Sequence, residues 1–133
     1  MKKIIVAEDN TLLREGLCMM INSDSTLEVV AQAVDGFSAI ETTLSLKEPP
    51  DLVIMDLSMP RMDGVSAIKE IKRQRPESKI MALTIHDSDE FIQECFDAGA
   101  SGYCLKDSSQ EELLKAIHVV LSGKTYISPG ITG

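Results

Sequence analysis

Short apolar runs along this 133-residue chain are followed by polar side chains that suit metal and phosphate chemistry. The runs lead, in chain order, to Glu8 and Asp9, then Asp56, Thr84 and Lys106. Carboxylates that lie close together repel one another unless a cation or a proton intervenes. Oxygen ligands of this kind suit Mg²⁺, which takes a few carboxylates and keeps several waters. We therefore expect a magnesium site if these residues meet in the fold.

A carboxylate beside both Mg²⁺ and an ammonium group is placed to attack a phosphoryl group. Asp56 is the candidate nucleophile, and the Lys106 ammonium would stabilise charge on the transferring oxygens together with the metal. A hydroxyl at Thr84 would then hydrogen-bond the attached phosphoryl group. Each residue alone has an ordinary explanation, such as a helix cap for Asp9 or a solvated lysine for Lys106. Only the combination favours the chemical interpretation.

The position of Asp56 follows from the apolar run before it. Residues 51–55 are short, largely apolar and contain the β-branched pair Val53-Ile54, which is typical of a central strand buried on both faces. Pro60 and Gly64 stop the strand soon after. Asp56 is thus expected at the carboxyl end of a buried strand, where open parallel α/β sheets bind their ligands.

Strand-like and helix-like segments alternate along the whole chain. Strands are predicted at residues 4–7, 27–34, 51–55, 80–84 and 102–105, with helices after Asn10 or Thr11, Asp35, Asp63-Gly64, Asp87 or Ser88, and Ser108 or Ser109. This (βα)5 pattern predicts an α/β fold: a doubly wound, parallel, five-stranded sheet with helices on both faces. All strands then end at one edge, which brings the polar residues together.

The composition of the chain argues against several classes of protein. A net charge of −8 argues against a protein that binds polyanions directly, because phosphate contacts need Lys and Arg. Three cysteines without a CxxC motif argue against a disulfide framework or a zinc site. The first apolar run is too short for a signal peptide and no segment suits a membrane span. We expect a cytoplasmic protein with no membrane partner.

The last ten residues differ from the rest. Residues 124–133 lack periodicity and contain one proline and two glycines. We therefore predict one domain over residues 1–123, followed by the start of a linker, 124–133, to an output domain absent from this chain.

The chain resembles the receiver domain of bacterial two-component response regulators. The matching residues are Glu8-Asp9, Asp56-Leu57-Ser58-Met59-Pro60, Asp63-Gly64, Thr84 and Gly102-Tyr103-Cys104-Leu105-Lys106, in the family's order and spacing over residues 4–122. The resemblance implies the flavodoxin-like receiver fold with strand order 2-1-3-4-5.

The resemblance also implies roles in a phosphorylation reaction. Asp56 would be the phosphoacceptor and Lys106 would contact the phosphoryl group. Mg²⁺ would be held by Glu8, Asp9 and Asp56, with the backbone carbonyl of Ser58 as a further ligand. The domain would catalyse only its own phosphorylation and dephosphorylation, and we do not expect an enzyme in the ordinary sense.

A conformational switch is implied as well. Thr84 would move toward the phosphoryl group, and Tyr103 would turn inward into the vacated space. Ser58 and His86 would tune loss of the phosphoryl group. Ile85 occupies a position where many receivers have a small residue, and we hypothesise that it narrows access to Asp56.

Other residues resemble one subfamily, the NarL/FixJ group with a LuxR-type helix-turn-helix output. They are the Gly102–Ser108 segment, Glu111-Glu112-Leu113, the Ser122-Gly123-Lys124 turn and the tail from Tyr126 to Pro129. The implied partners are a sensor histidine kinase and the chain's own C-terminal output domain, which would regulate transcription and alone contact DNA. Homodimerisation on phosphorylation stays open.

Two other functions are considered. A phosphatase with a phosphoaspartate intermediate usually has a second acid two residues after the nucleophile, but position 58 is Ser. A receiver-like interaction module without phosphorylation would not need the complete acid and lysine set.

Lys106 is followed by Asp107 rather than the proline common in receivers, which leaves a cis or trans peptide open.

Overall fold

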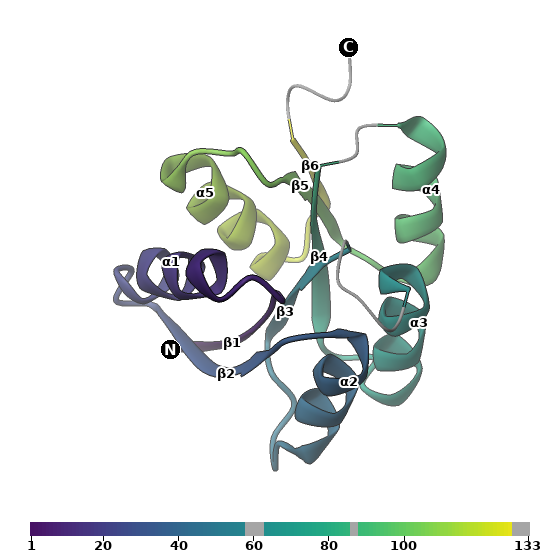
Figure 1. The fold of residues 1–133 in the computed structure, drawn as a ribbon, viewed down its shortest axis with the longest axis horizontal. Helices are drawn as coiled ribbons and strands as arrows, with labels where there is room; N and C mark the ends of the chain where they lie inside the picture. Colours follow the sequence, from purple (N-terminus) through teal and green to yellow (C-terminus); the bar gives the residue numbers. More distant parts are fainter. Residues whose placement is uncertain (58–62, 86–87, 129–133) are drawn as a thin grey trace.

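The computed structural model describes residues 1–57, 63–85 and 88–128 (Figure 1). Strands and helices alternate in the order β1 (Lys2–Ala7), α1 (Thr11–Asn22), β2 (Leu27–Ala33), α2 (Gly36–Ser45), β3 (Leu52–Asp56), α3 (Gly64–Gln74), β4 (Lys79–Thr84), α4 (Asp89–Ala98), β5 (Gly102–Leu105), α5 (Gln110–Leu121) and β6 (Tyr126–Ile127). The strands form one parallel sheet in the order β2-β1-β3-β4-β5-β6. The predicted α/β class and the order 2-1-3-4-5 are confirmed.

The helices cover both faces of the sheet, with α1 and α5 on one side and α2, α3 and α4 on the other (Figure 1). Alternation along β1 divides its side chains between two hydrophobic cores. Ile5 and Ala7 pack toward α2, α3 and α4, whereas Ile4 and Val6 pack toward α1 and α5. The central strands therefore need apolar residues at nearly every position. Within the described parts of the chain, no helix has both the length and the apolar character needed to cross a membrane.

The register of the central strands aligns their carboxyl ends. Ala7 lies beside Met55, Asp56 beside Leu83, and Thr84 beside Leu105. The residues that end or follow these strands are therefore presented at one edge of the sheet.

Polar caps begin the helices at that edge. The side chains of Asn10, Ser88 and Ser109 each accept a hydrogen bond from a backbone N–H in the first turn of α1, α4 and α5. For each of these helices the sequence offered two neighbouring residues as the cap, and these hydrogen bonds identify which one it is. Gly99 ends α4 with φ +117°, a left-handed conformation that glycine adopts without strain.

The sheet has a sixth strand that the sequence did not predict. Tyr126 and Ile127 pair in parallel with Gly102 and Tyr103 of β5. Two residues are too few to show an alternating pattern, and the pairing depends on the edge that β5 offers. The receiver fold therefore continues past residue 123 to Ser128. The rest of the predicted linker, 129–133, lies outside the described residues.

Close packing around Gly102 generates a stability prediction. A Cβ atom there would lie 2.8 Å from both Met81 Cγ and Val120 Cγ2, one on the neighbouring strand and one on α5. We expect Gly102→Ala to lower the free energy of unfolding by about 1–3 kcal/mol, because overpacking displaces side chains. Urea denaturation measures the change.

Gly16 is the matched control, since a Cβ atom at this position in α1 would meet nothing within 4 Å. Gly16→Ala should raise stability by roughly 0.5–1 kcal/mol through helix propensity. Wild-type stability for Gly102→Ala would contradict the close packing of β5 against α5.

Candidate functional site

Asp56 is the last residue of β3, a strand whose five residues are all buried. Its side chain has no exposed surface. The next residue is tied to the adjacent strand, because Leu57 donates its N–H to the Leu83 carbonyl at 3.1 Å. The strand therefore carries a carboxylate to the edge of the sheet and holds it there.

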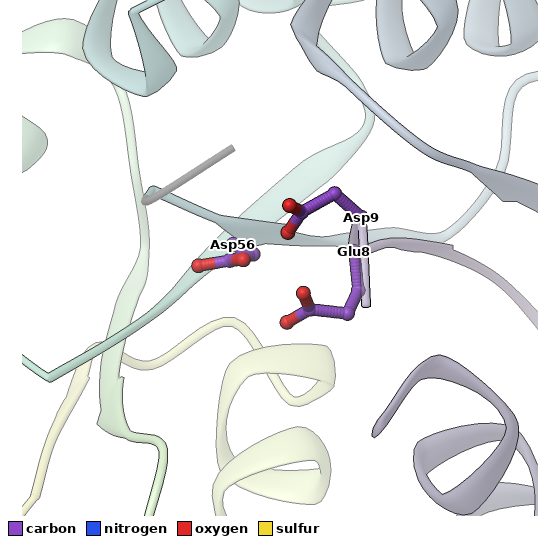
Figure 2. A group of neighbouring side chains, drawn as sticks. All are labelled: Glu8, Asp9 and Asp56. Carbon is purple, nitrogen blue, oxygen red and sulfur yellow. The ribbon is translucent and has the colours of Figure 1, made fainter. Parts of the chain in front are cut away.

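Glu8 and Asp9 follow β1, and Figure 2 shows their carboxylates turned toward that of Asp56. Glu8 is fully buried and Asp9 is exposed. Two backbone N–H groups hold this turn: Glu8 donates to the Ala33 carbonyl at 2.9 Å, and Asn10 donates to Glu8 Oε2 at 3.0 Å. The turn thus joins β1 to α1 in a fixed conformation.

Arg14 also holds the turn, and the sequence analysis missed it. Its Nη1 donates to the Glu8 carbonyl at 2.9 Å, and its Nε donates to Gln32 Oε1 on β2 at 3.0 Å. A cation near the N-terminus of a helix is electrostatically unfavourable. That unfavourable position, near the start of α1, was the signal in the sequence that could have identified Arg14.

The three carboxylates form one cluster. Ligand atoms of Glu8, Asp9 and Asp56 all lie within 4.8 Å of one another. Lys106 joins them from the end of β5, with its Nζ 3.0 Å from Asp56 Oδ2 and 3.3 Å from Glu8 Oε1. The Lys106 N–H donates to the Thr84 carbonyl at 2.8 Å, which fixes its backbone. The structure thus brings together four residues from three strand ends.

The charges of the cluster do not balance, since one ammonium group faces three carboxylates. Burial raises the pKa of Glu8 to about 7; the Asn10 N–H opposes this shift, and the Asp9 and Asp56 carboxyl groups add to it. Burial lowers the pKa of Lys106, but the Asp56 and Glu8 carboxylates outweigh that effect and leave it raised. The cluster therefore favours taking up a proton or a cation.

These residues fit Mg²⁺. The donors are carboxylate oxygens, the exposed Asp9 leaves room for water, and three carboxylates face a single ammonium group. Glu8, Asp9 and Asp56 could hold the ion. Ser58, the fourth predicted ligand, lies outside the described residues.

The predicted switch residues lie on two neighbouring strands, β4 and β5. Thr84 is buried at the end of β4, and Tyr103 is fully buried in β5. Ile85 follows Thr84 and is 70% exposed. It lines a cavity of about 370 Å³ together with Leu105, Lys106 and Asp107. His86 lies outside the described residues, and the Lys106–Asp107 peptide is trans.

The geometry defines a class of protein: a parallel α/β sheet whose strand ends join three acids and a lysine. Residues 4–118 match the response regulator receiver domain family, and the chain belongs to that family.

Named relatives place the chain within the family. The transcriptional regulatory protein DegU of Brevibacillus brevis is 36% identical over 130 residues, covering 98% of this chain and 54% of the relative. The chain thus spans about half the length of that protein. A two-component response regulator of the LuxR family from Aurantimonas sp. SI85-9A1 has a similar structure, with a TM-score of 0.91 and 34% identity over 97% of this chain and 91% of that one.

A third similar structure is the isolated receiver domain of RcsB from Salmonella enterica serovar Typhimurium in the presence of the phosphomimetic BeF₃⁻. Its TM-score is 0.88 at 26% identity, over 98% of this chain and 96% of that one. The relatives are response regulators of the NarL, DegU and LuxR type, so the predicted receiver domain and the NarL/FixJ group are confirmed.

The raised pKa of Glu8 generates a prediction about stability without metal. Between about pH 4.5, the reference pKa, and about pH 7, the folded chain holds a proton on Glu8 that the unfolded chain has lost. The free energy of unfolding should therefore fall as pH rises through this window. The fall should be on the order of 3 kcal/mol, since one pKa unit corresponds to about 1.4 kcal/mol.

Urea denaturation of wild type and Glu8→Gln, in buffer with a chelator, measures this effect. Glu8→Gln should lack the fall, because its side chain stays neutral at every pH. Glu41→Gln changes an exposed carboxylate on α2 and should keep the wild-type profile. Equal pH profiles for Glu8→Gln and wild type would show that Glu8 does not hold the proton.

Proposed function

We propose that this domain is the phosphorylation-activated switch of a two-component response regulator, with Asp56 as phosphoacceptor and a histidine kinase as donor. The observation that carries the proposal is the buried Asp56 carboxylate, 3.0 Å from Lys106 and grouped with two further acids. A like-charged, buried cluster is costly for folding. Phosphoryl transfer would give each residue of the cluster a role that offsets this cost.

The residues have separate tasks in this reaction. Glu8, Asp9 and Asp56 would hold Mg²⁺, with the Ser58 carbonyl as a further proposed ligand. When bound, the ion would neutralise charge on the carboxylates and on the phosphoryl oxygens. An Asp56 carboxylate oxygen bonds to phosphorus as the bond from phosphorus to the kinase histidine nitrogen breaks. The electron pair of that bond leaves with the imidazole.

Lys106 would bind the transferred phosphoryl group. Its ammonium already pairs with Asp56, and once the carboxylate has become an acyl phosphate, a phosphoryl oxygen is the more strongly charged partner. Arg14 and the Asn10 N–H keep the Glu8 turn in place through the reaction. The protein thus contributes position and charge, which are the main requirements of phosphoryl transfer.

The switch is the second part of the proposal. Thr84 would turn its hydroxyl to the phosphoryl group, and the inward position of Tyr103 would be stabilised by the space this leaves. Both side chains are buried, on adjacent strands. The surface formed by α4, β5 and α5 would then differ between the two states.

The output is proposed from the relatives. DegU is a transcriptional regulatory protein about twice as long as this chain, and the Aurantimonas protein is of the LuxR family. We infer that the intact protein acts in the cytoplasm and carries a helix-turn-helix output after a linker that includes residues 129–133. That domain would contact DNA and regulate transcription, and phosphorylation would promote homodimers.

Intact-mass measurement with Mg²⁺ and acetyl phosphate tests the function. Wild type should gain one phosphoryl group, and Asp56→Ala should gain none, because its nucleophile is missing. Asp97→Ala, which alters an exposed acid on α4, should react like wild type. A phosphoryl group on Asp56→Ala, or none on wild type with either acetyl phosphate or a histidine kinase, would overturn the proposal. Continuous release of phosphate would instead favour the phosphatase alternative.

The same assay decides two finer roles. If Ile85 narrows access to Asp56, Ile85→Ala should react several-fold faster with acetyl phosphate; an unchanged rate would refute that role. If His86 tunes the phosphorylated lifetime, His86→Ala should change the rate at which the added mass is lost, and an unchanged rate would remove His86 from the mechanism.

A further inference from the structure

The C-terminal segment 126–128 is fastened to β5, as the position of β6 beside β5 in Figure 1 shows. Tyr126 donates its N–H to the Ser101 carbonyl at 3.1 Å, and Ser128 donates its N–H to the Tyr103 carbonyl at 3.0 Å. The Leu105 N–H donates to the Ser128 side-chain Oγ at 3.0 Å. The segment is thus held along the whole length of a four-residue strand.

The side chains of this segment pack on both faces of the sheet, with Ile127 partly buried. Tyr126 is 9% exposed and belongs to the core beneath α1 and α5. Ile127 packs against the opposite core, which contains Tyr103, its register partner. Ser128 is 1% exposed. The segment therefore contacts the strand that carries the proposed switch tyrosine.

The same strand leads directly into the phosphorylation site. Leu105, whose N–H is held by Ser128, is joined by one peptide bond to Lys106. The Lys106 N–H donates a hydrogen bond to the Thr84 carbonyl, and its Nζ forms ion pairs with Asp56 and Glu8. A displacement of the Lys106 backbone would therefore reach the Leu105 N–H that Ser128 holds.

A short terminal strand can simply cover a sheet edge. Two features indicate that this segment does more than cover the edge of the sheet. In the third attachment, the side chain of the buried Ser128 accepts a hydrogen bond from the N–H of Leu105, the residue that precedes Lys106. Within the described part of the chain, the segment is three residues long, and an attachment this short can be shifted by a modest change in β5.

We propose that residues 126–128 form a clip whose attachment to β5 is coupled to phosphorylation of Asp56. The clip is bound more tightly when Lys106 contacts the phosphoryl group and Tyr103 stays buried, as it is in this structure. This inference rests on the proposed function. In a longer chain, the clip fixes the point at which the following residues leave β5.

Hydrogen exchange of single amides, followed by NMR on the 133-residue chain, tests the coupling. Mg²⁺ with beryllofluoride serves as the phosphoryl mimic. The Tyr126 and Ser128 amides should exchange about tenfold more slowly once it is bound, within the range of typical coupling energies. The Lys2 and Leu27 amides, hydrogen-bonded to the Thr26 and Asp24 carbonyls near the opposite edge of the sheet, should not change.

Linkage requires the reverse effect as well. Ser128→Ala removes the acceptor for the Leu105 N–H and should weaken beryllofluoride binding about fivefold, since a coupled hydrogen bond contributes about 1 kcal/mol. Ser25→Ala, at an exposed serine remote from β5, is the matched control and should bind like wild type. Circular dichroism and urea denaturation verify that both variants are folded.

The outcomes separate the two proposals. Beryllofluoride binding with unchanged exchange at Tyr126 and Ser128, and wild-type affinity for Ser128→Ala, would overturn the clip and leave the proposed function standing. The segment would then only cover an edge. Failure of beryllofluoride to bind the wild-type chain would overturn the proposed function and the clip together.

Discussion

An unbalanced charge at a buried strand end is the constraint on which the rest of the structure depends. Three carboxylates meet one ammonium group where β1, β3 and β5 end, and burial of Glu8 and Asp56 withholds the water that would otherwise solvate those two carboxylates. The apolar core around these strands must supply enough stability to tolerate this charge. The site is therefore suited to a cation and, in the function we propose, to a phosphoryl group.

The parallel sheet is what makes such a cluster possible. Strands that are far apart in sequence end at one edge, and the register places Asp56 beside Leu83 and Thr84 beside Leu105. The turn after β1 is joined to β2 by the Glu8 N–H, which donates to the Ala33 carbonyl. Asn10 and Arg14 hold it further through hydrogen bonds to Glu8. Position, rather than unusual chemistry, distinguishes these acids from ordinary surface carboxylates.

Much of this arrangement could be predicted from the chain alone. The apolar runs before Glu8, Asp56 and Lys106 specify buried strands, and an alternating fold places their ends together. The strand order came from the family resemblance, because hydrophobic periodicity does not say which strands are neighbours. Tyr126 and Ile127 escaped prediction because a two-residue strand has no period. Arg14 escaped because no motif encodes its two acceptors, the Glu8 carbonyl and Gln32 Oε1; its unfavourable place near the start of α1 was the one signal.

Binding of Mg²⁺ tests the central claim most directly. An NMR titration with Mg²⁺ at pH 8 should shift the amide signals of residues 8–10, 56–57 and 106 together, with one dissociation constant. Asp9→Asn keeps the shape of an exposed ligand but removes its charge, and it should weaken binding by at least about tenfold, as loss of a charged ligand does. Shifts scattered over the surface, or the same affinity in Asp9→Asn, would contradict a metal site at this edge of the sheet.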